Sequence, residues 1–88
     1  MKKQISTFFA LMAEFGTAEI PLEDISEKFF GLQPSMAKLR AARRQLPVPA
    51  YRCGTQKSGW LVSAKDLADY IDEQRHKAKQ EWEKFHAA

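Results

Sequence analysis

The chain has 88 residues, which is enough for one small domain with a modest hydrophobic core. Its hydrophobic content of 44% and its ten aromatic residues argue against intrinsic disorder, and its apolar runs are too short to cross a membrane. The single cysteine, Cys53, cannot form an internal disulfide, and one thiol with two histidines offers too few ligands for a zinc site. We therefore expect a cytoplasmic protein without a metal or cofactor.

Basic and acidic residues are segregated along the chain. The segment 28–65 contains eight of the fourteen basic residues and none of the eleven acidic ones, so the flanks are acidic. The net charge of +3 is small, but a separate positive segment of this kind is typical of proteins that bind polyanions. The alternative is a solvated surface whose charges balance in three dimensions.

Residues 1–16 are predicted to form an amphipathic helix that ends at Gly16. The start of the chain resembles a signal peptide, but Glu14 interrupts its apolar run, so we interpret it as part of the fold. Apolar side chains recur at the spacing of one helical face and are expected to pack in the core: Ile5, Phe8, Phe9, Met12 and Phe15.

Residues 21–46 have the outline of a helix-turn-helix. Pro21 suits the first position of a helix over residues 22–30, where acidic residues in the first turn complement the helix dipole. A short turn with a glycine follows, and a third helix is predicted from Pro34 to about Leu46, where a Pro-Val-Pro element stops it. Two short helices joined by a tight turn with a glycine are typical of this motif.

Two short β-prone runs follow, and the polar loop between them begins with Gly54. This pattern predicts a hairpin over residues 50–62, and a hairpin directly after a helix-turn-helix is a wing. Residues 18–20 form a short connection that is also compatible with a strand.

A long final helix is predicted over residues 64–86, because Ser63 and Asp66 form a capping box at its start. Its inner face is expected to consist of Leu67, Tyr70, Ile71, Gln74, Ala78, Trp82 and Phe85. The first half of this helix should close the core, whereas the second half is too long for so small a core to cover. The second half is therefore either a solvated helix end or a homodimer contact made by Ala78, Trp82 and Phe85.

These elements together predict a mostly α-helical fold with a small β-hairpin. We interpret residues 1–88 as a single winged helix-turn-helix domain with a long C-terminal helix.

The basic residues concentrate in AKLRAARRQLPVPAYR, residues 37–52, which contains five of them and no acid. At 100° per residue, Leu32, Met36, Leu39 and Leu46 fall on the core side of the third helix. The opposite face is then predicted to consist of Pro34, Ala37, Lys38, Ala41, Arg44 and Gln45.

On this predicted outer face, the small residues Ala37 and Ala41 would let the helix approach a surface closely. Arginine, lysine and glutamine side chains match the acceptor patterns of guanine and adenine in the major groove. The predicted partner is therefore double-stranded DNA, and the predicted contacts of the third helix are Gln33, Ser35, Lys38, Arg40, Ala41, Arg44 and Gln45.

The wing tip carries polar and basic side chains that suit a phosphate or the minor groove. Arg43 falls near the core side of the wheel, from where it is predicted to reach a phosphate or to pair with an acid of the second helix. Lys57 could instead be a solvated loop lysine. The predicted contacts of the wing and its flank are Arg43, Arg52, Thr55, Gln56, Lys57 and Ser58.

Catalytic patterns are not found in the sequence. There is no Ser-His-acid or Cys-His constellation and no phosphate-binding glycine loop. We therefore expect no enzymatic activity and no small-molecule substrate.

The sequence resembles the pyocin activator protein family over nearly its whole length. The most specific pieces are IPLEDISEKFF at 20–30, LPVPAYR at 46–52 and VSAKDLADYID at 62–72. The resemblance implies a small bacterial activator that binds DNA near promoters of phage-tail-like bacteriocin or prophage genes. Such a protein would be nucleoid-associated when bound, with RNA polymerase as a further partner. The resemblance carries over no DNA-contacting residues.

Two alternative functions remain open at this level. The order of the elements also resembles excisionases and the DNA-binding domains of MerR-type regulators, and an excisionase would bend DNA during recombination. A protein-interaction module that uses the C-terminal helix is the other alternative, because Trp82 and Phe85 lie near the end of that helix.

Overall fold

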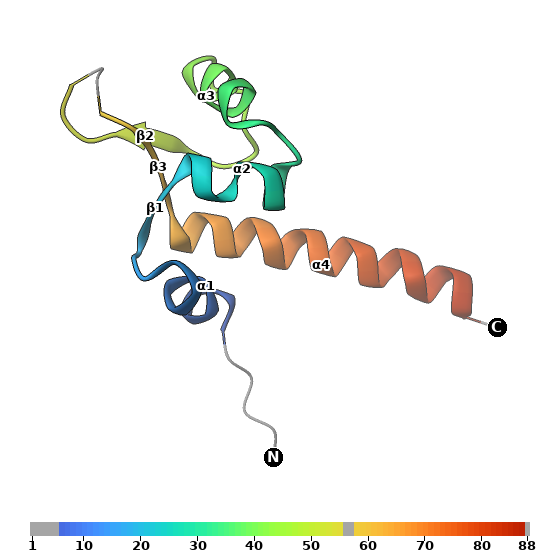
Figure 1. The fold of residues 1–88 in the computed structure, drawn as a ribbon. Coiled ribbons are helices and arrows are strands. Elements are labelled where there is room, and N and C mark those ends of the chain that lie inside the picture. The colour runs from blue at the N-terminus through green and yellow to red at the C-terminus, as the bar shows by residue number, and fades with distance from the viewer. Residues whose placement is uncertain (1–5, 56–57, 88) are drawn as a thin grey trace.

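The computed structural model describes residues 6–55 and 58–87. Its elements in chain order are α1 (Thr7–Phe15), β1 (Glu19–Pro21), α2 (Leu22–Phe30), α3 (Pro34–Ala42), β2 (Ala50–Arg52), β3 (Trp60–Ser63) and α4 (Ala64–His86) (Figure 1). The structure confirms the predicted mostly helical fold with a small hairpin and a long C-terminal helix, an arrangement compatible with a winged helix.

The three strands form an antiparallel sheet in the order β1-β3-β2. The hairpin of β2 and β3 confirms the predicted wing, and β1 shows that the connection after α1 includes a strand. In the register of the sheet, Val62 of the central strand pairs with Ile20 on one side and with Ala50 on the other. Because Ile20 and Val62 are fully buried, the sheet contributes its central row to the hydrophobic core.

Helices lie on both sides of α4. In Figure 1, α1 crosses below the first half of α4, and α2 lies between α4 and α3. The rings of Phe30 and Tyr70 pack edge to face, with centroids 5.6 Å apart, and join α2 to α4. An exposed ion pair of 2.8 Å between Lys28 and Glu14 joins α2 to α1. The buried hydrophobic residues are Leu11, Ile20, Leu22, Ile25, Ala37, Ala41, Val48, Val62, Ala64, Leu67 and Ala68.

The predicted apolar face of α1 is partly wrong. Leu11, which was not assigned to that face, is the buried residue of α1, whereas Phe9 is largely exposed. Phe8, Met12 and Phe15 pack against the core as expected. Ile5 and the predicted start of this helix lie outside the described residues.

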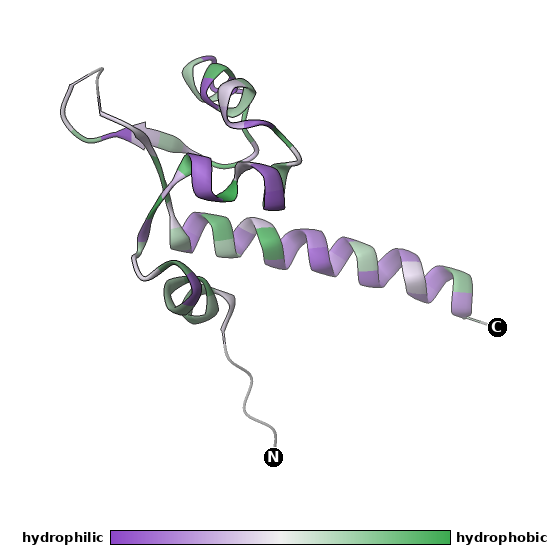
Figure 2. Cartoon of the chain, in the orientation of Figure 1, coloured by the Kyte–Doolittle hydropathy of each residue, from purple (hydrophilic) through white to green (hydrophobic). Residues whose placement is uncertain are grey.

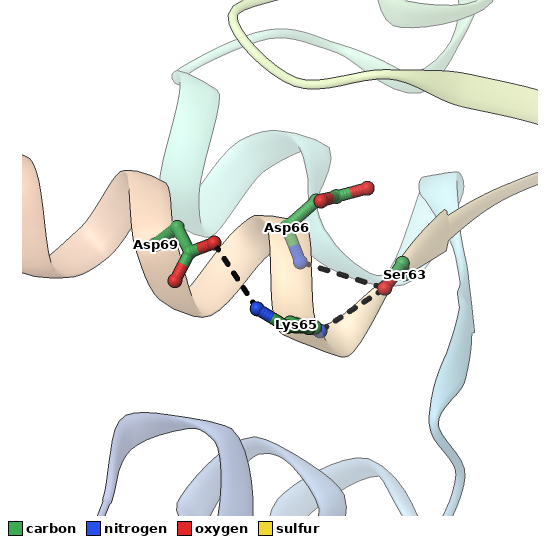
Figure 3. Close-up of polar contacts among 4 residues, drawn as sticks. All are labelled: Ser63, Lys65, Asp66 and Asp69. Carbon is green, nitrogen blue, oxygen red and sulfur yellow. Dashed lines mark hydrogen bonds and ion pairs between the residues drawn. The ribbon is translucent and has the colours of Figure 1, made fainter.

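The start of α4 confirms the predicted cap. The hydroxyl of Ser63 accepts hydrogen bonds from the backbone amides of Lys65 at 3.1 Å and Asp66 at 3.4 Å (Figure 3). These bonds satisfy two of the amides that the first turn of a helix leaves without partners. The cap therefore fixes the point at which the wing becomes α4.

The second half of α4 extends beyond the rest of the structure (Figure 1). The predicted inner face is therefore split: Leu67 is buried and Tyr70 and Ile71 pack against the core, but the residues from Asp72 to Ala87 are exposed. Figure 2 shows that this half is mainly hydrophilic with hydrophobic residues interspersed. The ring of His86 stacks on Trp82 with 4.1 Å between centroids, but Trp82 is still 60% exposed and Phe85 is 90% exposed, so most of their apolar surface is open to solvent.

Within the described ranges, no helix is both long and apolar enough to cross a membrane. The same residues include no group of three or more histidine, cysteine or acidic side chains that could hold a metal ion.

Candidate nucleic-acid interface

The helix-turn-helix consists of α2, the turn at residues 31–33 and α3. Gln33 adopts an extended conformation at the N-cap of α3, and Pro34 occupies the first helical turn, where its missing amide removes no helical hydrogen bond. α3 is nine residues long, and its exposed side is turned away from α2 and the core. Both helices thus begin where the sequence predicts.

The predicted end of α3 is wrong. The helix ends at Ala42 rather than near Leu46, because the chain closes it with a Schellman turn. The amide of Gln45 donates to the carbonyl of Arg40 at 2.8 Å, and the amide of Arg44 donates to the carbonyl of Ala41 at 3.1 Å. Arg44 therefore has a left-handed backbone with a φ of 56°, which its sequence context did not reveal.

The predicted rotation of α3 is also wrong. Ala37 is fully buried and Ala41 is 5% exposed, so both belong to the core rather than to an outer face. Met36 and Leu39, which were assigned to the core, are exposed. Ala41 is therefore withdrawn as a DNA contact.

The helical-wheel prediction of the rotation of α3 was wrong because it included Leu32 and Leu46. These two side chains do pack against the core, but both residues lie outside α3, so their positions say nothing about the rotation of the helix. Between residues 34 and 42, two alanines and two larger apolar residues lie on opposite sides. Only the packing decides which pair points inward.

The outer face of α3 follows from the buried alanines. Leu39 lies about 160° from both Ala37 and Ala41 around the helix axis, so it marks the middle of the outer face. Its neighbours on this face include small residues as well as cations. The exposed residues of the helix and of the turn after it are Ser35, Met36, Lys38, Leu39, Arg40, Ala42, Arg43, Arg44 and Gln45.

Arg43 lies on the outer face and not near the core side. It is the C-cap residue of α3, one turn beyond Leu39, and it is exposed. Within the described part of the chain, Arg40, Arg43 and Arg44 form no ion pair. Their charges therefore remain available to an anionic partner.

Lys38 occupies one flank of the outer face, next to the hairpin. Its ammonium nitrogen lies 4.0 Å from a carboxylate oxygen of Glu23 in α2, and both side chains are more than half exposed. An ion pair of this length and exposure contributes little stability. Lys38 also borders a groove of about 400 Å³ that is lined by Pro21, Leu22, Glu23, Lys38, Cys53, Ser58, Gly59, Trp60 and Leu61.

The hairpin places one cation against an aromatic ring. The guanidinium of Arg52 stacks over Trp60, its cross-strand partner, with 4.2 Å between its central carbon and the ring centroid. This cation–π contact and the half-buried position hold Arg52 near the base of the wing. Thr55 is exposed and Ser58 half-buried, with the amide of Ser58 donating to the carbonyl of Thr55 at 3.0 Å. The predicted contacts Gln56 and Lys57 lie outside the described residues.

The two outer strands of the sheet are also linked by a side-chain hydrogen bond. The hydroxyl of Tyr51 in β2 donates to the carboxylate of Glu19 in β1, across the central strand. This bond, with smaller contributions from desolvation and from the Glu19 charge, raises the pKa of Tyr51 to about 12. The link ties the wing to the strand that precedes α2.

The structure brings most of the predicted contacts to one end of the molecule. Gln33 and Ser35 lie at the start of α3, Lys38 and Arg40 along it, and Gln45 just after it, all exposed. The sequence prediction missed Met36 and Leu39 as surface residues. A wheel limited to the helix would have shown that they lie opposite the two alanines, but it would not have shown which side is buried.

An α2–turn–α3 unit followed by an antiparallel hairpin and a long helix is the fold of a small winged helix-turn-helix protein. The family model of the pyocin activator protein PrtN matches residues 7–78, so the chain belongs to this family. The match extends from α1 into α4 and stops before Trp82 and Phe85. No curated protein and no solved structure matches the chain.

Membership of this family supports a role as a transcriptional activator of pyocin genes. The family is a regulatory one rather than an enzymatic one.

Proposed function

We propose that this protein binds double-stranded DNA and thereby activates transcription of pyocin-type genes. In this proposal α3 enters the major groove, and the hairpin lies against the flanking backbone or minor groove. The observation that carries it is the exposed cationic surface of α3 and its terminal turn, formed by Lys38, Arg40, Arg43 and Arg44. Family membership supports the regulatory part of the proposal.

The shape of α3 suits a groove. The major groove of B-DNA is wide enough for one α-helix, and the outer face of α3 includes the short side chains of Ser35 and Ala42. Short side chains let the backbone of a helix approach the bases closely. Arg40 and Arg43 could then reach guanine edges or phosphates.

The backbone conformation of Arg44 also supports a contact between this cationic surface and DNA. A left-handed residue at a helix end is usually glycine, because other residues are strained there. An arginine at this position accepts that strain while placing an exposed cation next to Arg43. A phosphate contact would explain this combination of a strained backbone and an exposed charge.

DNA binding can be tested by mobility-shift titration. The full chain would be titrated against the upstream region of a pyocin-type operon and against random duplex, each at two salt concentrations. We expect nanomolar, sequence-dependent binding that weakens steeply with salt, because cationic contacts release counterions. Equal, weak binding to both duplexes would overturn the proposal and favour a protein-interaction module.

The charge-removing variants Arg40→Ala and Arg43→Ala define the surface. Loss of a base contact should weaken specific binding by about 1–3 kcal/mol, and loss of a phosphate contact should lower the salt slope by about one. Lys65→Ala is the matched control, since Lys65 is an exposed lysine at the start of α4 and α2 separates α4 from α3 in Figure 1. Equal effects of all three variants would mean that only net charge matters.

Activation and DNA bending make different predictions. A promoter fused to a reporter should require the intact cationic surface for activation, and RNA polymerase is the proposed partner at that promoter. An excisionase-like protein would instead bend its site, as shown by circularly permuted fragments, and would leave the reporter unchanged.

We also propose that the protein is a homodimer joined through the second half of α4. Ala78, Trp82 and Phe85 lie on one side of this helix. The exposed apolar surface of Trp82 and Phe85 is typical of a protein–protein contact. An antiparallel pair that crosses between Lys79 and Gln80 would place Glu81 of each copy close to Lys77 of the other. The same pairing would lay Trp82 over the small side chain of Ala78.

Sedimentation equilibrium of the full chain tests the dimer. Trp82→Ala and Phe85→Ala should weaken association, whereas Gln80→Ala, on the opposite side of α4, should not. A monomeric wild type, or equal association in all three variants, would overturn this part of the proposal. A dimer would read two half-sites about 34–36 Å apart, which a footprint would show.

A further inference from the structure

The middle of the cationic surface is apolar. Leu39, opposite the buried alanines, is 43% exposed, and Met36, one turn before it and about 60° around the helix, is 44% exposed. Arg43 follows Leu39 by one turn, while Lys38 and Arg40 lie on the two flanks. An apolar patch of two residues is thus surrounded by cations on a helix whose other side is packed in the core.

The surrounding charge limits what can cover this patch. No acidic residue occurs between Lys28 and Lys65, and Glu23, which approaches Lys38, is the one carboxylate that forms an ion pair with α3 in the described residues. An apolar protein surface would have to carry matching acids to tolerate these cations. A DNA major groove supplies the anions as phosphates, and it also has an apolar feature, because each thymine carries a 5-methyl group in that groove.

We propose, on the basis of the DNA binding proposed above, that Leu39 and Met36 contact thymine 5-methyl groups, so that the protein selects sites with thymine under the middle of α3. Leucine and methionine cannot hydrogen-bond to base edges, and burying a methyl group against them removes apolar surface of both partners from water. The flanking arginines and lysine fix the helix on the backbone, and the apolar pair reads the methyl groups.

The spacing of the two side chains sets the spacing of the thymines. Residues three apart rise about 4.5 Å along a helix axis, and successive base pairs rise about 3.4 Å. Met36 and Leu39 therefore reach thymines one or two base pairs apart. The short side chains of Ser35 and Ala42 on the same face leave room for this approach.

Replacing thymine by deoxyuridine tests this inference, because the exchange removes one methyl group and leaves the Watson–Crick edge intact. Each thymine of the footprinted duplex would be replaced in turn, and the Kd of the full chain would be measured by fluorescence anisotropy at constant salt. We expect a loss of about fourfold at one to three positions in each half-site and no change elsewhere.

Leu39→Ala identifies the side chain that reads the methyl group. This variant should weaken binding to the thymine duplex but should bind the sensitive deoxyuridine duplex as well as the wild type does, since the partner of Leu39 is already absent there. Arg43→Ala is the matched comparison, because it should weaken binding to both duplexes by the same factor. Thermal unfolding of Leu39→Ala would confirm that this exposed position leaves the fold unchanged.

The possible failures can be told apart. Specific binding that no deoxyuridine substitution affects would refute the methyl contact and leave the proposed function standing. Absence of any specific binding would instead refute the proposed function. If Leu39→Ala abolished reporter activation without changing the DNA affinity, the apolar patch would contact a protein, and the inference would again be wrong.

Discussion

Replacement of Arg44 by glycine should stabilise the protein and weaken its binding to DNA. Arg44 occupies the left-handed position of the turn that ends α3, with a φ of 56°. In that conformation the Cβ atom of an L-residue approaches the following carbonyl oxygen, and glycine has no Cβ. The two amide hydrogen bonds of the turn involve only the backbone, so they should persist in the variant.

The size of the gain follows from two opposing contributions. Relief of the left-handed strain favours the folded variant by about 1–2 kcal/mol. The greater freedom of glycine in the unfolded chain opposes this by about 0.4–1 kcal/mol. The midpoints of these two ranges differ by about 0.8 kcal/mol, so the free energy of unfolding should rise by about that amount, which raises the Tm of a domain of this size by about 3–6 °C.

Urea unfolding of Arg44→Gly and Arg44→Ala checks this reasoning. Both variants lose the same charge, but alanine keeps the Cβ atom and the strain, so only the glycine variant should be more stable than the wild type. In mobility shifts, both should lose about one unit of the salt slope if Arg44 contacts a phosphate. A glycine variant no more stable than the alanine variant would refute the strain argument.

Three further predictions concern α3, the cap of α4 and the sheet. Ala37→Leu should overpack the core and lower the free energy of unfolding by about 1–3 kcal/mol. Ala42→Leu, on the exposed side of α3, should change it by less than about 0.5 kcal/mol. Similar denaturant midpoints for the two variants would mean that α3 is rotated differently. Ser63→Ala should cost about 1 kcal/mol in the same assay and Ser63→Asp much less, because aspartate also caps a helix; equal losses would show that the cap contributes nothing. Tyr51 should titrate near pH 12 by ultraviolet absorbance, above the ordinary pKa of about 10, and its neutral form should stabilise the fold below pH 10 and lose that effect as the pH rises to 12. Tyr51→Phe should lack the late absorbance step, and its persistence would assign the high pKa to the other tyrosine.

Most element boundaries could be predicted because they depend on neighbouring residues. Pro21 precedes α2 as its N-cap residue, one position before the first helical position at which it was predicted, and Ser63 begins α4 through its own hydroxyl. The hairpin follows from β-prone runs on either side of a polar loop. The end of α3 was the exception, since an arginine took the left-handed position that glycine usually marks.

The basic surface and its residues were also predictable in outline. Charge segregation and the helix-turn-helix pattern pointed to α3, and the cations of this helix are exposed in the structure. The rotation of α3 was not predictable, because Ala37 and Ala41 on one side and Met36 and Leu39 on the other form two alternative apolar faces. The sequence of a nine-residue helix with two such faces does not determine which of them is buried.

The sequence by itself determined the order and most of the limits of the elements, the concentration of positive charge in 28–65, and the surplus length of α4. Those properties arise from local backbone preferences and from composition. Only the tertiary structure decided which face of α3 meets the core. The small alanines allow α3 to pack closely against its neighbours, and burying them leaves Leu39 and Met36 outside among the arginines.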